Sequence, residues 1–181
     1  MSKLSTLKTS HKIAAGLVGA ALLVAGPAYA ATSAGITLTG SVQQILNLSV
    51  TATTAASALD LTANVSGLKI ATVLAESNKT TGYAVSVSSA NQSSSNCTTT
   101  SGPCFHSPVG GGSGSNMPFT LSRNSVNVSF TGATGQFVTT TARSILGGDT
   151  YDAKVSYDGV SAALPQASNY TETLTFTISA P

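Results

Sequence analysis

The chain has 181 residues, with eight Lys and Arg against six Asp and Glu. Because three of the bases, Lys3, Lys8 and Lys12, precede residue 13, five bases face six acids from Ala31 onward. From Ala31 onward the chain therefore has no cluster of positive charge of the kind that binds nucleic-acid phosphates, which excludes nucleic acid as the partner. A stretch of about 150 residues accommodates one domain with a core, but not two of ordinary size.

The first thirty residues have the parts of a secretory signal peptide. The basic segment Met1–Lys12 precedes an uncharged apolar run, Ile13–Ala25, and Ala28-Tyr29-Ala30 offers small residues for cleavage. The apolar run is shorter than the roughly 20 residues that span a bilayer. We therefore expect residues 1–30 to be removed, no membrane span, and export through a periplasm to the cell surface or the medium.

The composition beyond the leader indicates an all-β domain. From Ala31 onward the chain contains 24 Ser and 24 Thr, and it has no Trp. Thr and Val suit a pleated surface, whereas helices favour Leu, Glu, Lys and Arg.

Even-numbered positions from residue 36 to residue 50 form one long apolar face. They are Ile36, Leu38, Gly40, Val42, Gln44, Leu46, Leu48 and Val50. As one strand they would extend roughly 50 Å at about 3.3 Å per residue, whereas a domain of about 150 residues is roughly 40 Å across. Either a bulge at Gly40 or Gln43-Gln44 places two strands in one sandwich, or the first part projects and pairs with another molecule.

Period-two alternation predicts five further strands, each half-buried and antiparallel. They cover Leu68–Leu74, with the even positions apolar, Tyr83–Val87, Val126–Phe130, Tyr151–Tyr157 and Leu174–Ile178. Turn residues separate them at Lys79–Gly82, Thr131–Gly135 and Gly147–Asp149, and Asp158-Gly159 is typical of a hairpin turn. Short strands at such spacing predict a β-sandwich.

The region from Asn91 to Asn116 is rich in Ser, Thr and Gly and predicts one long irregular surface loop. We expect Cys97 and Cys104 to form a disulfide, since they are the only cysteines of an exported chain. The loop is either a binding loop or a tolerated insertion.

No catalytic or metal-binding constellation stands out. His106 is the only histidine after the leader, and no nucleophile elbow, zinc-protease helix or P-loop occurs. Asp149, Asp152 and Asp158 cluster in sequence, but strand alternation and turn positions account for them without calcium. We expect no enzymatic activity, no cofactor and no metal.

The last strand, Tyr170–Ser179, runs almost to Pro181, so no later segment completes its neighbouring position in the sheet. The strand Ile36–Val42 of one molecule could fill that position in the next by β-strand addition. Head-to-tail contacts of this kind do not close, and they build a filament.

The segments Leu38–Val42 and Leu46–Val50, together with Asn169–Ile178, resemble the two ends of chaperone-usher pilins of the archaic, spore coat protein U-like type. In the last segment a Tyr, an acid and Thr-Leu precede alternating apolar residues, as in the final strand of that family. Many relatives have a cysteine shortly after the first strand, where this chain has Thr51–Ala56.

The resemblance implies a single immunoglobulin-like β-sandwich, residues 44–181, that lacks its last strand. It implies a donor-strand extension, residues 31–43, and the partners would be neighbouring subunits, a periplasmic chaperone and an outer-membrane usher. The expected donor strand comprises Ile36, Leu38, Gly40 and Val42, and the expected wall of the acceptor groove comprises Leu174, Phe176 and Ile178.

We therefore expect a structural subunit of a bacterial fimbria or pilus that serves adhesion or biofilm formation. Two alternatives remain open from the sequence. One is a monomeric secreted sandwich that binds a sugar or a surface protein through residues 91–116, and the other is a coat or matrix protein that associates through its sheet faces.

Overall fold

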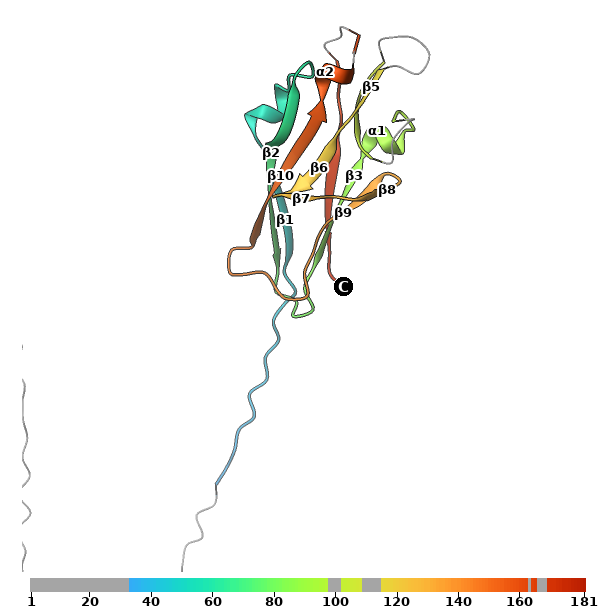
Figure 1. Cartoon of the computed structure of the whole chain (residues 1–181). Helices are drawn as coiled ribbons and strands as arrows, with labels where there is room; N and C mark the ends of the chain where they lie inside the picture. The colour runs from blue at the N-terminus through green and yellow to red at the C-terminus, as the bar shows by residue number, and fades with distance from the viewer. Residues whose placement is uncertain (1–32, 98–101, 109–114, 163, 166–168) are drawn as a thin grey trace, which may run out of the picture. The chain divides into compact units, whose positions relative to one another are not determined.

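The structure, a computed structural model, describes residues 33–97, 102–108, 115–162, 164–165 and 169–181 (Figure 1). The expected signal peptide, residues 1–30, lies outside the described residues. The chain divides into two units, Met1–Gly40 and Ser41–Pro181. The second unit is an all-β sandwich, as the composition and the alternation predicted.

Two main sheets, here sheet A and sheet B, form the sandwich. Sheet A has the order β1 (Leu46–Ala52), β2 (Asn64–Ser77), β10 (Asp149–Asp158), β6 (Thr120–Arg123) and β7 (Val126–Asn127). Sheet B has the order β11 (Leu174–Ser179), β3 (Ala84–Ser89), β9 (Thr134–Thr139) and β8 (Phe130–Thr131). A small third sheet pairs β4 (Cys104–Ser107) with β5 (Ser115–Pro118), and the helical turns are η1 (Thr54–Ser57), α1 (Ala90–Ser93) and α2 (Gly159–Ala162). All these strand pairings are antiparallel.

The core lies between the two sheets and consists of their inward-facing apolar side chains. Val73 of β2 and Val155 of β10 come from sheet A, and Val85 and Val87 of β3 come from sheet B; all four are buried. Period-two alternation thus produces the inward apolar face that the strands around Tyr83–Val87, Tyr151–Tyr157 and Leu174–Ile178 were expected to have, although that face is only partly buried in Leu174–Ile178.

The predicted apolar face of Leu68–Leu74 is wrong beyond Ile70, since Leu68 and Ile70 still pack against the core. Ala71 pairs with Ala153 and Lys69 pairs with Lys154, so the ladder shifts around Ile70 and the odd-numbered residues face the core from there. Ala71 is buried, whereas Leu74 is exposed. A β-bulge of this kind reverses the alternation of every residue that follows it.

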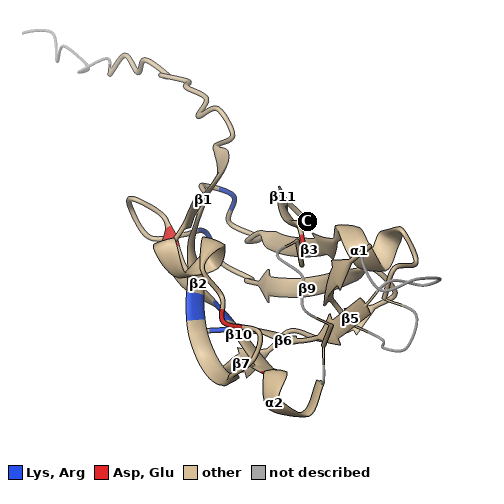
Figure 2. Ribbon diagram, turned by 90° about the horizontal axis from the view of Figure 1, so that it is seen from above, with Lys and Arg blue, Asp and Glu red and all other residues tan. Residues whose placement is uncertain are grey.

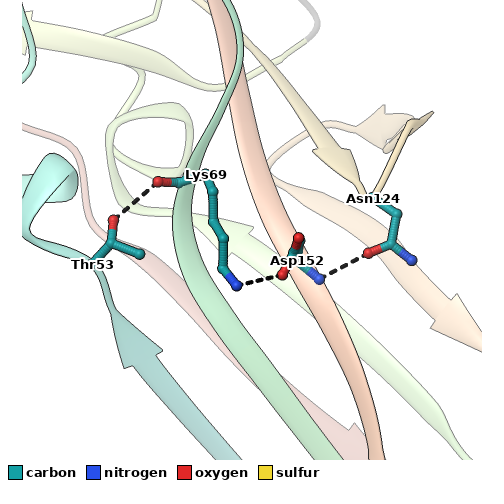
Figure 3. A network of polar contacts seen from close by, with 4 residues as sticks. All are labelled: Thr53, Lys69, Asn124 and Asp152. Atoms are coloured by element: carbon teal, nitrogen blue, oxygen red, sulfur yellow. Dashed lines mark hydrogen bonds and ion pairs between the residues drawn. The ribbon is translucent and has the colours of Figure 1, made fainter.

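Polar contacts hold the chain around this bulge (Figure 3). Thr53 Oγ1 donates to Lys69 O at 2.9 Å, and Lys69 Nζ lies 2.6 Å from Asp152 Oδ1. The backbone N–H of Asp152 donates to Asn124 Oδ1 at 2.9 Å. The contacts connect the β1–η1 junction, β2, β10 and the β6–β7 turn across sheet A.

Two further local predictions are wrong. Val126–Phe130 is not one strand, because Val126 belongs to β7 in sheet A and Phe130 to β8 in sheet B. Asp158-Gly159 forms no hairpin, since Gly159 begins α2, whose Ser161 N–H donates to Asp158 Oδ1. Gly159 is needed for space, because a Cβ there would lie 2.2 Å from Leu61 O.

The region from Asn91 to Asn116 is not an irregular surface loop where it is described. It contains most of α1, all of β4 and the start of β5, and both Phe105 and nearby Met117 are buried in the core. The expected disulfide is confirmed, with a Cα–Cα distance of 5.8 Å between Cys97 and Cys104.

Charge is distributed unevenly between the sheets (Figure 2). The strands β3, β8, β9 and β11 of sheet B contain no Asp, Glu, Lys or Arg. In sheet A, β2 and β10 carry Lys69, Glu76, Asp149, Asp152, Lys154 and Asp158. Sheet B therefore presents only uncharged side chains, apolar inward and mostly hydroxyl-bearing outward.

A part-buried polar contact joins Tyr83, which precedes β3, to β10. The Tyr83 hydroxyl donates to Asp149 Oδ2 at 2.6 Å and lies 2.7 Å from the Tyr151 hydroxyl. Burial, followed by these two hydrogen bonds, raises the pKa of Tyr83 well above its ordinary value, so the phenol stays protonated.

We expect Tyr83→Phe to lower the free energy of unfolding by about 1–3 kcal/mol, because Asp149 and Tyr151 lose a buried partner. Urea denaturation measures the change. Tyr170→Phe is the matched control, since it removes only the exposed bond to Pro165 O, and it should cost no more than about 0.5 kcal/mol. Equal losses in both variants would contradict the prediction.

Candidate functional site

The edge strands β1 and β11 lie near one another on one side of the sandwich. Strand β1 is the outermost strand of sheet A, and β11 is the outermost strand of sheet B. No ladder joins the two strands within the described residues. Each strand therefore has one edge whose backbone N–H and C=O groups form no ladder with another strand of these sheets.

Inward-facing side chains of these two strands are less covered than their neighbours. Val50 of β1 pairs with Val73 of β2, yet Val50 is 44% exposed and Val73 is 0% exposed. Phe176 of β11 pairs with Val87 of β3, and Phe176 is half-buried whereas Val87 is fully buried. We call this row of side chains the β1–β11 opening; it comprises Leu46, Leu48, Val50, Leu174, Phe176 and Ile178.

The predicted groove residues Leu174, Phe176 and Ile178 thus lie together, along one wall of the opening. Leu46 and Leu48, which sequence analysis assigned to the first strand, form the other wall together with Val50. The alternation predicts that these residues face inward, but only the pairing of β1 with β2 places them opposite β11.

The two ends of the opening can be distinguished by their contacts. At one end, the Ile45 end, Asn78 exchanges hydrogen bonds with the backbone of Ile45, and the adjacent Lys79 Nζ contacts Pro181 O. Because Ile45 precedes β1 and Pro181 follows β11, the two strands run in opposite directions. The other end, where β11 begins, is called the Tyr170 end.

Glu172 fixes the start of β11 at the Tyr170 end. Its Oε1 accepts from the backbone N–H groups of Ala90, Asn91 and Thr173 at 3.0, 3.2 and 2.7 Å. Its Oε2 accepts from Ser89 Oγ at 2.5 Å. Four donors around one carboxylate join β11 to the end of β3 and to α1.

The disulfide region supports the same end. The backbone N–H and C=O groups of His106 in β4 pair with those of Thr171, at 3.1 and 3.0 Å. Asn91 Nδ2 donates to the carbonyls of both Cys104 and Thr171. The segment that looked like a candidate binding loop therefore holds one wall of the opening in place.

A cavity of about 720 Å³ lies at the Tyr170 end. Apolar side chains contribute much of its lining, including Leu59, Leu61, Phe105, Leu164 and Tyr170. Residues 56–62 follow β1, and residues 170–172 precede β11. The cavity thus lies where the two walls of the opening end.

The predicted donor residues belong to no helix or strand. Residues 33–45, here the leading segment, have no regular secondary structure. Ile36, Leu38 and Val42 are 85%, 85% and 88% exposed, and a Cβ on Gly40 would meet nothing within 4 Å. The alternative in which a bulge within residues 36–50 places two successive strands in one sandwich is therefore wrong, because the only strand of these residues is β1, which begins at Leu46.

The three aspartates of the sequence cluster do not converge. Asp149 accepts from Tyr83, Asp152 pairs with Lys69, and Asp158 caps α2. Within the described residues no group of three or more His, Cys, Asp or Glu is arranged to hold a metal ion. None of the helices in the described ranges is long and apolar enough to cross a membrane.

Comparison with protein families, with characterised proteins and with solved structures finds no match to this chain.

We expect Glu172→Ala to destabilise the sandwich by about 2–3 kcal/mol, because it removes a charged acceptor from four donors. Hydrogen exchange should show the largest loss of protection in β11. Glu76→Ala is the control, since Glu76 accepts an exposed hydrogen bond from Asn47 Nδ2 at 3.1 Å, and it should leave β11 protected. Unchanged exchange in β11 of Glu172→Ala would show that the carboxylate does not anchor the strand.

Proposed function

We propose that the chain is a structural subunit of a surface filament, in which each sandwich accepts the leading segment of a neighbouring copy. One observation carries the proposal. The inward side chains of β1 and β11 are left partly uncovered, while their paired neighbours in β2 and β3 are fully buried. A strand added between β1 and β11 would cover that row and satisfy the free edge of β11.

The leading segment has the pattern that such a strand needs. Ile36, Leu38 and Val42 lie on one side of an extended chain, and the segment Ile36–Val42 is about as long as β11. Burying these three side chains would contribute roughly 5–9 kcal/mol, at about 1.5–3 kcal/mol each. An exposed apolar strand without a partner is a liability that proteins otherwise avoid.

Antiparallel addition to β11 continues the antiparallel pairing of sheet B, in which the other edge of β11 pairs with β3. The added strand then runs parallel to β1. In that direction Val42 lies beside the start of β11. The register that places Val42 opposite Leu174 also places Gly40 opposite Phe176 and Leu38 opposite Ile178. The residue without a side chain then faces the largest side chain of the wall, which already packs against Phe137 with ring centroids 5.0 Å apart.

Such contacts are head-to-tail, so they propagate into a filament instead of closing. With the resemblance to chaperone-usher pilins, the proposal includes an immunoglobulin-like subunit, export guided by residues 1–30, a periplasmic chaperone that lends a strand, and an outer-membrane usher. The disulfide suits an exported protein. Adhesion or biofilm formation is the role that a surface filament of this type would have.

We expect Gly40→Val to reduce the heat-labile, SDS-resistant ladders of the secreted material about tenfold or more, because overpacking costs about 1–3 kcal/mol. The measurement compares unboiled and boiled samples on SDS gels. Gly35→Val is the matched control, since Gly35 lies outside the alternating segment and is equally uncrowded. Normal ladders from Gly40→Val would count against the proposal.

The register has its own test within this experiment. Phe176→Ala should restore part of the ladders of Gly40→Val, because it removes the aromatic ring that the added isopropyl group would meet. If Leu174→Ala restored the ladders and Phe176→Ala did not, Gly40 would face Leu174, and the register would differ from the proposed one by two residues.

Deletion of residues 31–43 distinguishes a sandwich that accepts a strand from another copy from a sandwich that is complete by itself. We expect the shortened chain to keep its β-sheet circular dichroism and its disulfide but to form no ladders, and to bind a synthetic peptide of residues 33–45 added in trans. Loss of the fold on deletion would instead assign the leading segment to the core of its own sandwich.

A further inference from the structure

A pair of aliphatic side chains lies exposed at the Ile45 end of the sandwich. Leu146 is fully exposed and Ile145 is 70% exposed, between β9 and β10. Ile45 and Leu74 are exposed large hydrophobic residues of the same end. Single exposed apolar residues are ordinary, but a group of four at one end of an otherwise hydroxyl-rich surface indicates a contact surface.

Hydrogen bonds define the backbone turn that carries this pair. Gly148 N–H donates to Ile145 O at 3.0 Å, which closes a tight turn with Leu146 and Gly147 at its corner, and Gly147 has φ of +90°. Before the turn, buried Ser144 is tied to Ser77 by its N–H and its Oγ at 3.0 and 3.2 Å. The fold therefore presents Ile145 and Leu146 on a hydrogen-bonded turn, which we call the 145–146 knob.

Charge differs between the two ends. At the Tyr170 end, the cavity lining includes the acids Asp60 and Glu172 and, among the described residues, no Lys or Arg. Asp158 lies at the same end of sheet A, where it pairs with Asn64 at the start of β2. Hydrogen bonds from Thr62 keep the pKa of exposed Asp60 below its usual value, so this acid is ionised at neutral pH. The Ile45 end carries Arg143, two residues before the knob and beside the same hollow as Glu76.

Chain geometry limits what can face the knob in a filament. Val42 and Ile45 are three residues apart, so at most about 10 Å of chain separates a gripped Val42 from the Ile45 end. If the strand adds antiparallel to β11, Val42 lies at the Tyr170 end of the neighbour. The Ile45 end of one copy and the Tyr170 end of the next are then held against each other.

We infer that the 145–146 knob of one copy docks in the 720 Å³ cavity at the Tyr170 end of its neighbour. This second contact rests on the proposed strand exchange and adds a stiffening interface to it. The cavity has the size of a small-ligand pocket, which leaves room for two aliphatic side chains. Arg143 would approach Asp60 at the rim of the same contact.

Cysteine cross-linking tests the docking directly. Cys97 and Cys104 are paired and are the only native cysteines, so Leu146→Cys with Ala58→Cys introduces one thiol on the knob and one on the cavity lining. With a short bis-maleimide, we expect ladders that survive boiling. Val126→Cys with Ala58→Cys is the control, because Val126 is exposed on β7, away from the knob; docking should give roughly tenfold more covalent product than this control, through the raised effective concentration.

A second variant measures stiffness. Leu146→Asp should keep the heat-labile ladders, because the leading segment is intact, while electron microscopy shows a several-fold shorter persistence length of the filaments. Val126→Asp should leave the persistence length unchanged. Absence of cross-linked ladders together with an unchanged persistence length in Leu146→Asp would overturn the docking.

The two proposals fail separately. Normal ladders from Gly40→Val would contradict the proposed strand exchange, and with it the docking that depends on strand exchange. Loss of ladders in Gly40→Val, with no effect of the knob substitutions, would support strand exchange and contradict only the docking.

Discussion

An apolar sheet face has to be covered, and in this sandwich the coverage stops at the β1–β11 opening. Every inward residue of β2, β3 and β10 near the centre has a strand on each side, so these strands bury Val73, Val87 and Val155 fully. Strands β1 and β11 have a neighbour on one side only, and Val50 and Phe176 stay partly uncovered. The proposed filament follows from this one unbalanced edge.

An edge strand with a half-exposed apolar face gains less stabilising free energy from packing than a central strand does. In β11, hydrogen bonds at the start of the strand add stabilisation, because Glu172 accepts from four donors and Thr171 pairs with His106 of β4. The disulfide closes the chain beside β4. These contacts explain why residues 91–116, despite their loop-like composition, contribute buried residues and a sheet of their own.

Local periodicity predicted the all-β class and most strands, and it failed where pairing decides the outcome. The bulge around Ile70 reverses the inward face of β2, and its cause is a ladder with β10, about eighty residues away in sequence. Val126 and Phe130 alternate correctly but belong to different sheets. Both walls of the β1–β11 opening have an apolar alternation that the sequence reveals, although the sequence predicted only Leu174, Phe176 and Ile178 as a wall. Their incomplete burial depends on which strands lie beside them in the two sheets, and no local pattern encodes that.

Residues 36–50 show most clearly what alternation leaves undetermined, because Leu38 and Leu48 carry the same pattern but have different surroundings. Asn78 marks the boundary: its Nδ2 donates to Gln43 O at 2.7 Å, its Oδ1 accepts from Ile45 N–H at 2.8 Å, and its backbone N–H reaches Ile45 O. The side chain thus satisfies the backbone just before β1 in place of a further strand pair. A sandwich that fixes the chain at this point by one amide can keep β1 in register with β2 whatever the leading segment does, which is the condition for that segment to pair with another molecule.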